Sequence, residues 1–151
     1  MHYPVMLSEA LAALRVRADG TYLDATAGLG GYTRAIASML ETGRVIAADR
    51  DGESLEMAKQ NTAGFEERIQ WVQAAFSDLG AALALLGTGP VDGVVADLGV
   101  SRYQLTDAAR GFSLQADGPL DMRMNREETT TAAALINTMA ERSLAELIYQ
   151  L

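Results

Sequence analysis

The sequence predicts an α/β fold built on an open, parallel sheet of the Rossmann-like type. Between residues 21 and 97, four short apolar runs alternate with three helical patterns, and such alternation is typical of parallel strands joined by right-handed crossovers. A glycine-rich turn at 24–32 directly follows the first apolar run. The length of 151 residues, of which 49% are apolar and 21% charged, fits about one folded domain.

The elements follow from local pattern. We expect strands at 21–24, 44–49, 68–73 and 91–97, and helices at 32–40, 53–60 and 79–86. The fourth strand is of the apolar kind that is buried on both faces, and Ser8 and Asp78 are candidate N-caps. Right-handed crossovers let the first three strands proceed in one direction and the fourth lie on the other side of the first. The ligand cleft then lies between strands one and four.

The alternation fails at 98–126, a polar segment too long for an ordinary connection and therefore functional or a linker. Helical patterns resume at 130–139 and at a capping box that begins at Ser143. The fourth strand would be an edge with unpaired backbone at Val94 and Val95. Either another chain covers this edge, for example by self-association, or the sequence is a fragment of a longer protein. Because the sequence stops within a helical pattern without a C-cap, we expect the second.

Charge limits the class of partner. A net charge of −8 argues against a general polyanion binder, because affinity for nucleic acid rests on Lys and Arg. The segment 102–126 is nevertheless net positive, with four arginines: Arg102, Arg110, Arg123 and Arg126. Arg110 and Arg123 in a mobile loop would suit phosphate contacts. Alternatively, they brace the loop by pairing with its carboxylates: Asp107, Asp117 and Asp121.

The sequence favours a cytoplasmic protein without a membrane partner. It has no cysteine, no run of about 18 apolar residues, and no basic and then apolar N-terminus. Metal-ligand clusters and P-loop spacing are also absent from the sequence, so we expect no metal site.

Polar and glycine residues gather where the predicted strands end. Gly28, Gly30 and Gly31 follow the first strand, and missing Cβ atoms there let backbone amides approach a ligand. Asp49 closes the second strand about 20 residues later, the spacing at which a carboxylate meets ribose hydroxyls. Phe76, after the third strand, could stack on adenine, although a core position also explains it. Asp97 closes the fourth strand, and together these residues predict an adenosine site.

Thr33 decides between cofactors. A dinucleotide fingerprint would place a third glycine there, so close approach of a pyrophosphate is not specified. S-adenosylmethionine has no phosphate and needs a carboxylate and ammonium site, which the glycine loop and Asp24 could supply. The sequence therefore favours a methyltransferase over the alternative of an NAD-dependent oxidoreductase. A glycine turn with no ligand at all remains the plainest alternative.

Several motifs occur in the order and at the spacing of one known family. They are His2-Tyr3-Pro4-Val5-Met6, Thr26-Ala27-Gly28-Leu29-Gly30-Gly31, Asp49-Arg50-Asp51 and Asp97-Leu98-Gly99-Val100-Ser101. More specific is the pair Arg110-Gly111-Phe112-Ser113 and Gly118-Pro119-Leu120-Asp121-Met122-Arg123-Met124. From residue 2 onward the chain resembles the family of ribosomal RNA small-subunit methyltransferase H. Its departures are Tyr32, where the family usually has His, and Arg102-Tyr103, where it usually has Ser-Pro.

The resemblance implies a class I methyltransferase that transfers a methyl group from S-adenosylmethionine to N4 of a cytidine in 16S rRNA of the small ribosomal subunit. Residues 1–109 would form the cofactor domain and 110–151 a lid loop with the start of a helical inserted domain. Cofactor contacts carried over by position are Gly30, Gly31, Tyr32, Asp49, Phe76, Asp97 and Gln104. Asp97 is the candidate catalytic acceptor, with the alternatives that it only contacts the cofactor or that a backbone carbonyl at 98–100 accepts. A cofactor-binding fragment without activity is the competing hypothesis.

Overall fold

The computed structural model describes residues 4–150, so His2 and Tyr3 of the first motif lie outside the described residues. The chain divides into two compact units, Met1–Gly99 and Val100–Leu151. The functional domain boundary that the sequence predicts after residue 109 stays a prediction. No helix within 4–150 is both long and apolar enough to cross a membrane.

The first unit is a four-stranded parallel sheet. Its strands are β1 (Thr21–Asp24), β2 (Arg44–Asp49), β3 (Ile69–Gln73) and β4 (Gly93–Val95). Their order is β3-β2-β1-β4, and the register pairs Asp24 with Ala47 on one side and with Val95 on the other. Strand order therefore changes direction between β1 and β4, as the sequence predicts. The Rossmann-like α/β fold class is confirmed.

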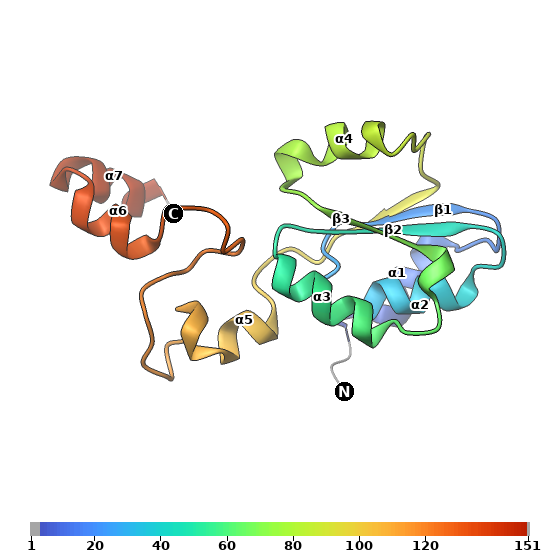
Figure 1. Ribbon diagram of the computed structural model, residues 1–151, viewed down its shortest axis with the longest axis horizontal. Helices are drawn as coiled ribbons and strands as arrows, with labels where there is room; N and C mark the ends of the chain where they lie inside the picture. The colour runs from blue at the N-terminus through green and yellow to red at the C-terminus, as the bar shows by residue number, and fades with distance from the viewer. Residues whose placement is uncertain (1–3, 151) are drawn as a thin grey trace. The chain divides into compact units, whose positions relative to one another are not determined.

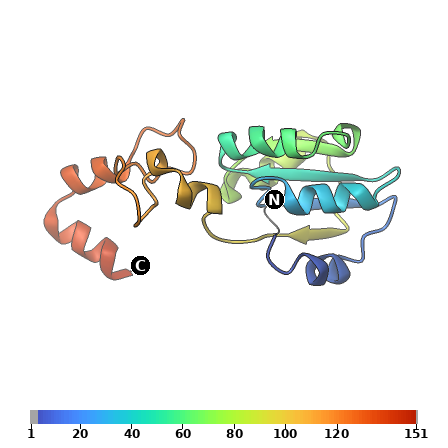
Figure 2. The ribbon, with the colours of Figure 1, turned by 90° about the horizontal axis from the view of Figure 1, so that it is seen from below.

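Helices cover both faces of this sheet (Figure 1). One face carries α1 (Leu7–Leu14), α2 (Gly31–Met39) and α3 (Gly52–Asn61), which Figure 2 shows from below. The other face carries α4 (Phe76–Leu85), and a short 3-10 turn, Glu66–Arg68, leads into β3. The sandwich of helix, sheet and helix gives the sheet a core on each face.

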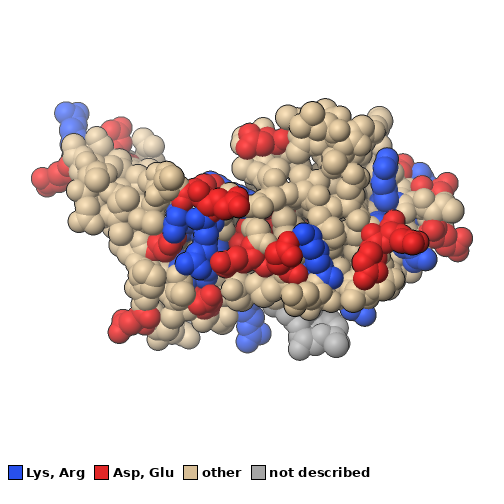
Figure 3. Space-filling view, in the orientation of Figure 1, with Lys and Arg blue, Asp and Glu red and all other residues tan. Residues whose placement is uncertain are grey.

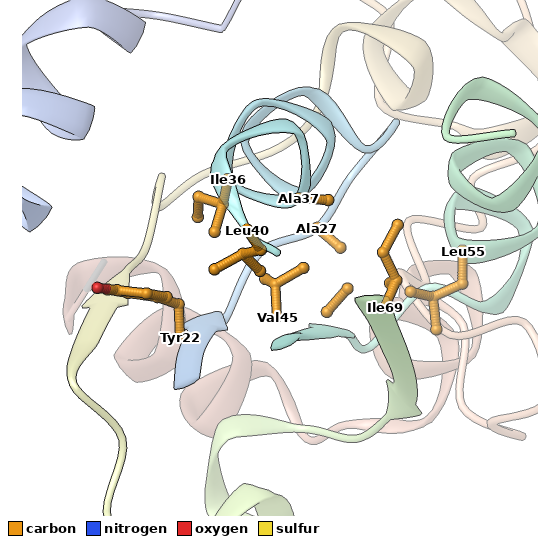
Figure 4. Packing of buried hydrophobic residues seen from close by; sticks show 9 residues of the cluster. Tyr22, Ala27, Ile36, Ala37, Leu40, Val45, Leu55 and Ile69 are labelled. Carbon is orange, nitrogen blue, oxygen red and sulfur yellow. The ribbon is translucent and has the colours of Figure 1, made fainter. Parts of the chain in front are cut away.

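The larger core lies between the sheet and the layer of α1, α2 and α3. Figure 4 shows Ile36 of α2 and Leu40, the C-cap residue of that helix, beside Val45 of β2, and Leu55 of α3 beside Ile69 of β3. On the other face, α4 packs Leu79 and Leu83 against a second cluster around Ile46. Burial of one such side chain contributes about 1.5–3 kcal/mol, so β2, buried on both faces, anchors the sheet.

Three predictions made from the sequence are wrong: the length and burial of β4, and the N-caps at Ser8 and Asp78. β4 has three residues rather than seven, and Val94 is 54% exposed, because β4 is an edge strand with a partner on one side only. Ser8 lies inside α1, whose N-cap is Met6, and Asp78 lies in the first turn of α4, whose N-cap is Ala75. Helix α4 thus begins three residues before the predicted start.

The second unit is mostly helical. It contains α5 (Arg102–Thr106), a 3-10 turn (Ala108–Arg110), α6 (Ala132–Thr138) and α7 (Glu141–Gln150). The segment predicted to lack regular structure therefore includes a helix, which a complete capping box of Ser101 and Gln104 starts. The predicted capping box at Ser143 is wrong, because α7 has already begun at Glu141.

The two motifs that are most specific to the resemblance pack against each other in this unit. The buried Arg110 donates from Nη2 to the carbonyls of Arg123 and Met124, at 3.1 and 2.8 Å. A Cβ on Gly118 would overlap the carbonyl of Ala108, and one on Gly111 would overlap that of Pro119. Close backbone contact explains both glycines without a ligand.

Arg123 forms a two-point ion pair. Its Nε and Nη2 donate to Oδ1 and Oδ2 of Asp121 at 2.7 and 2.6 Å, and this pairing lowers the pKa of Asp121 to about 2. The geometry favours the bracing alternative over phosphate contact for Arg123, and burial removes Arg110 from the surface. On the face drawn in Figure 3, basic side chains lie beside acidic ones.

Replacing Arg123 with Ala should therefore loosen the second unit. We expect a loss of about 2 kcal/mol in its unfolding free energy, because Asp121 would be left partly buried without its partner. Urea titration followed by NMR signals of residues 100–150 measures this. Arg142→Ala, at an exposed position of α7, is the control. Equal stability of the two variants would contradict the bracing role.

Candidate functional site

The carboxyl ends of the four strands meet at one edge of the sheet, where their following loops are joined. Three main-chain hydrogen bonds join them: Ala25 N to Val95 O (2.9 Å), Ala27 N to Ala48 O (2.8 Å) and Ala74 N to Asp49 O (3.0 Å). The structure thus brings the glycine loop, Asp49, Phe76 and Asp97 to the same edge, as predicted. In open parallel sheets this is where ligands bind.

The glycine loop is shaped largely by protein contacts. Gly28 and Gly30 adopt left-handed backbone, with φ of 51° and 87°. A Cβ on Gly30 would lie 3.0 Å from Cγ2 of Thr62, and one on Gly31 would overlap Pro4. A Cβ on Gly28 would meet only the carbonyl of Thr26, at 3.8 Å. Only Gly28 therefore has the open side that the sequence argument requires of all three glycines.

The side chain of Asp49 is hydrogen-bonded directly to this loop. Its Oδ2 accepts from Gly28 N at 2.8 Å and its Oδ1 from Asp51 N at 2.9 Å. Partial burial raises the pKa of Asp49, and these backbone donors oppose the rise. A carboxylate has about four lone-pair sites, so Asp49, with backbone donors from Gly28, Asp51 and Arg50, can still accept from a further hydroxyl group. The carboxylate is fixed in place before any ligand arrives.

A buried carboxylate lies beneath the loop. Asp24 is fully buried and accepts from the Thr33 hydroxyl at 2.6 Å and from Thr26 N at 3.3 Å. Burial raises the pKa of Asp24 to about 6, while the hydrogen bonds from Thr33 and Thr26 oppose the rise. Asp24 therefore holds the loop from inside, and complete burial limits its access to the ammonium group that the sequence argument assigns to it.

Phe76 and Asp97 are the exposed members of the site. Asp97 lies two residues beyond β4, and its backbone N–H donates to Oγ1 of Thr26 at 2.7 Å. Phe76 is the first residue of α4 and is 60% exposed, so the alternative that it is a core residue is wrong. An exposed aromatic ring at a strand end is available for stacking.

Tyr32 and Gln104 have structural contacts of their own. Tyr32 is buried, and its hydroxyl donates to the carbonyl of Val5. Gln104 belongs to the second unit, where its Oε1 accepts from Ser101 N at 2.9 Å in the capping box. Cofactor contact by either residue stays a prediction.

Two threonines that hold the site were not predicted in this role. In the sequence, Thr33 stands out only as the residue in place of a third glycine, and Thr26 only as part of a motif. The sequence Asp24-Ala25-Thr26 fits a turn in which an aspartate accepts from the backbone two residues on, and this could have located Thr26. Over residues 4–150, no group of three His, Cys, Asp or Glu side chains is placed to hold a metal ion.

Comparison with known proteins establishes the family. The model of the MraW methylase family matches residues 1–151. The chain belongs to the MraW methylase family. A curated relative from Solibacter usitatus, named ribosomal RNA small subunit methyltransferase H, is 56% identical over all of this chain and 53% of its own length. A relative of that name from Nitrosomonas europaea is 46% identical over 98% of this chain and 46% of its own length.

Solved structures agree on the fold of this MraW-family chain. A candidate rRNA methylase from Clostridium thermocellum matches with a TM-score of 0.52 at 18% identity, over 68% of this chain and 58% of that one. The C-terminal domain of precorrin-6Y C5,15-methyltransferase from Rhodobacter capsulatus matches at 0.50 and 25% identity, over 65% of this chain and 50% of that one. The chain spans about half the length of the curated relatives it matches.

The buried Asp24 should make stability depend on pH. Because its pKa is raised from 3.8 to about 6, the folded state binds the extra proton, and stability present below pH 4 is lost as pH rises to about 6. The loss is roughly 3 kcal/mol. Asp24→Asn, which carries no charge, should lessen this fall in urea unfolding from pH 4 to 7.

Asp19→Asn is the matched control, since Asp19 is exposed at the other end of β1. It should keep the wild-type profile. A wild-type profile for Asp24→Asn would contradict the assignment.

Proposed function

We propose that this chain binds S-adenosylmethionine at the carboxyl edge of its sheet, and that the protein methylates N4 of a cytidine in 16S rRNA. The observation that carries the proposal is the family match over the whole chain, whose curated relatives are named for a small-subunit rRNA methyltransferase. Because the chain spans about half of those relatives, the activity belongs to the proposal.

The residues present fit the cofactor. The open side of Gly28 admits the methionine portion, and the remaining lone-pair site of Asp49 suits a ribose hydroxyl. The exposed Phe76 ring offers a stacking surface for adenine. Helix α2 begins at Gly31, and the positive end of that helix favours a carboxylate. The amide of its N-cap, Gly30, already donates to the carbonyl of Ala27 at 2.7 Å.

Net charge at the edge also favours this cofactor over a dinucleotide. Two acidic residues, Asp49 and Asp97, lie beside the glycine loop, to which each is joined by a hydrogen bond. A pyrophosphate would add negative charge beside them, whereas S-adenosylmethionine brings a sulfonium and an ammonium group. Thr33, bonded to Asp24, occupies the position where a dinucleotide fingerprint has its third glycine.

The bound cofactor would supply a methyl group on a positively charged sulfur. Because the lone pair of the cytosine amino nitrogen is delocalised into the ring, this nitrogen must be turned toward the methyl carbon by an acceptor for its N–H. Asp97, or a backbone carbonyl of 98–100, is the acceptor that we propose. The protein contributes mainly by orienting the reacting groups in line.

Asp49→Ala should weaken binding of S-adenosylmethionine to this chain by about 1–3 kcal/mol, because a charge-assisted contact to the ribose is lost. Isothermal titration calorimetry measures the affinity. Asp19→Ala, at the opposite edge of the sheet, should bind as the wild type does. Wild-type affinity in Asp49→Ala would remove Asp49 from the site, and tight NAD binding with none of S-adenosylmethionine would overturn the proposal.

The rRNA substrate needs a separate test. A chimera that continues this chain with the second half of the Solibacter usitatus relative is incubated with small ribosomal subunits that lack the modification. We expect N4-methylcytidine in mass spectrometry of the digested 16S rRNA, and at least about tenfold less with Asp97→Ala. A methyl group on another atom, or none with a chimera that binds the cofactor, would contradict the substrate assignment.

A further inference from the structure

We propose that Thr26 is a positioning residue: its hydroxyl clamps the loop after β4 to the glycine loop and so sets the place of Asp97. The functional meaning of this clamp rests on the proposed function, in which Asp97 or a carbonyl of 98–100 accepts from the substrate. The clamp itself is a contact between loops that are 71 residues apart in sequence.

The loop after β4 has little else to hold it. Asp97 N donates to Thr26 Oγ1 at 2.7 Å, and within residues 4–150 this is the only hydrogen bond made by 97–99. β4 ends at Val95, residues 96–99 are exposed, and Gly99 has a φ of 140°. Without the Thr26 hydroxyl, the last described hydrogen bond between this stretch and the first strand would be that of Ala25 N to Val95 O, two residues before Asp97.

Thr26 is itself held rigidly. Its N–H donates to the buried carboxylate of Asp24, which also accepts from Thr33 in the first turns of α2. Main-chain bonds of Ala25 and Ala27 fix the residues on each side of Thr26 to β4 and β2. Because these bonds fix Thr26 relative to the sheet, its hydroxyl also fixes the position of Asp97 in the exposed loop after β4.

Position matters here because the acceptor must lie within hydrogen-bond reach of the target amino group. A displacement of about 1 Å can cost on the order of 100-fold in rate. Thr26 needs no contact with substrate in this account, since it acts through Asp97. Loss of the clamp should therefore affect methyl transfer more than cofactor affinity, which depends on Asp49 and the glycine loop.

The clamp is tested first without any ligand. Amide hydrogen exchange of Asp97, followed by NMR of this chain, should be about 3–10-fold faster in Thr26→Val, which removes the acceptor but keeps the shape. Thr26→Ser should restore the wild-type rate. Thr42→Val, at an exposed threonine before β2, is the control. Unchanged exchange in Thr26→Val, or failure of Thr26→Ser to restore it, would overturn the clamp.

A second measurement tests its role in the reaction. In the chimera, Thr26→Val should lower kcat by about tenfold while KM for S-adenosylmethionine changes less than about threefold. An unchanged kcat, or a rise in KM for S-adenosylmethionine as large as the fall in kcat, would contradict the positioning role. If Thr26→Val does not fold, Thr26→Ala and Thr26→Ser supply the same comparison. Absence of cofactor binding by the wild type would overturn the proposed function and leave the exchange result standing.

Discussion

The buried carboxylate of Asp24 is the constraint on which the candidate site depends. It lies at the end of the strand between β2 and β4, fully enclosed, and is held by the Thr33 hydroxyl and the Thr26 amide. Burial of a carboxylate is costly, as its raised pKa records, and hydrogen bonds from both sides offset that cost. The same bonds give the glycine loop one conformation. The buried carboxylate of Asp24 thus lowers the stability of the fold but fixes the conformation of the loop at the proposed ligand site.

Two further groups of the site are positioned by hydrogen bonds to this loop. The Gly28 amide donates to Asp49, whose carboxylate is fixed by backbone donors before any ribose is present. The Thr26 hydroxyl accepts from the backbone N–H of Asp97, in a loop that has no other hydrogen bond to the rest of residues 4–150. Pre-organisation of this kind reduces the entropic cost of ordering these protein groups when a ligand binds. The most exposed groups, Phe76 and Asp97, are then free to meet cofactor and substrate.

Sequence reasoning predicted the sheet well because crossover handedness and strand–helix alternation allow few alternatives. The prediction for β4 failed because its outcome depends on a partner distant in sequence, since an edge strand is exposed whatever its hydropathy. The start of α4 was missed because its N-cap, Ala75, has no capping side chain to mark it. At the site, Asp49 and Asp97 could be found because spacing places them at strand ends. The role of Thr26 could not be predicted, because its partner is 71 residues away in sequence. Thr62 and Pro4 leave no room for a side chain at Gly30 and Gly31, whereas contact of these glycines with a cofactor stays a prediction.

The central claim is that S-adenosylmethionine occupies this edge of the sheet. The most direct measurement is an NMR titration of the ¹⁵N-labelled chain with S-adenosylmethionine and, separately, with NAD. The account predicts saturable shifts with S-adenosylmethionine at the amides of Gly28, Gly30, Asp49 and Asp97, and none at these positions with NAD. Shifts confined to other parts of the chain, or saturation of the same amides by NAD alone, would contradict it.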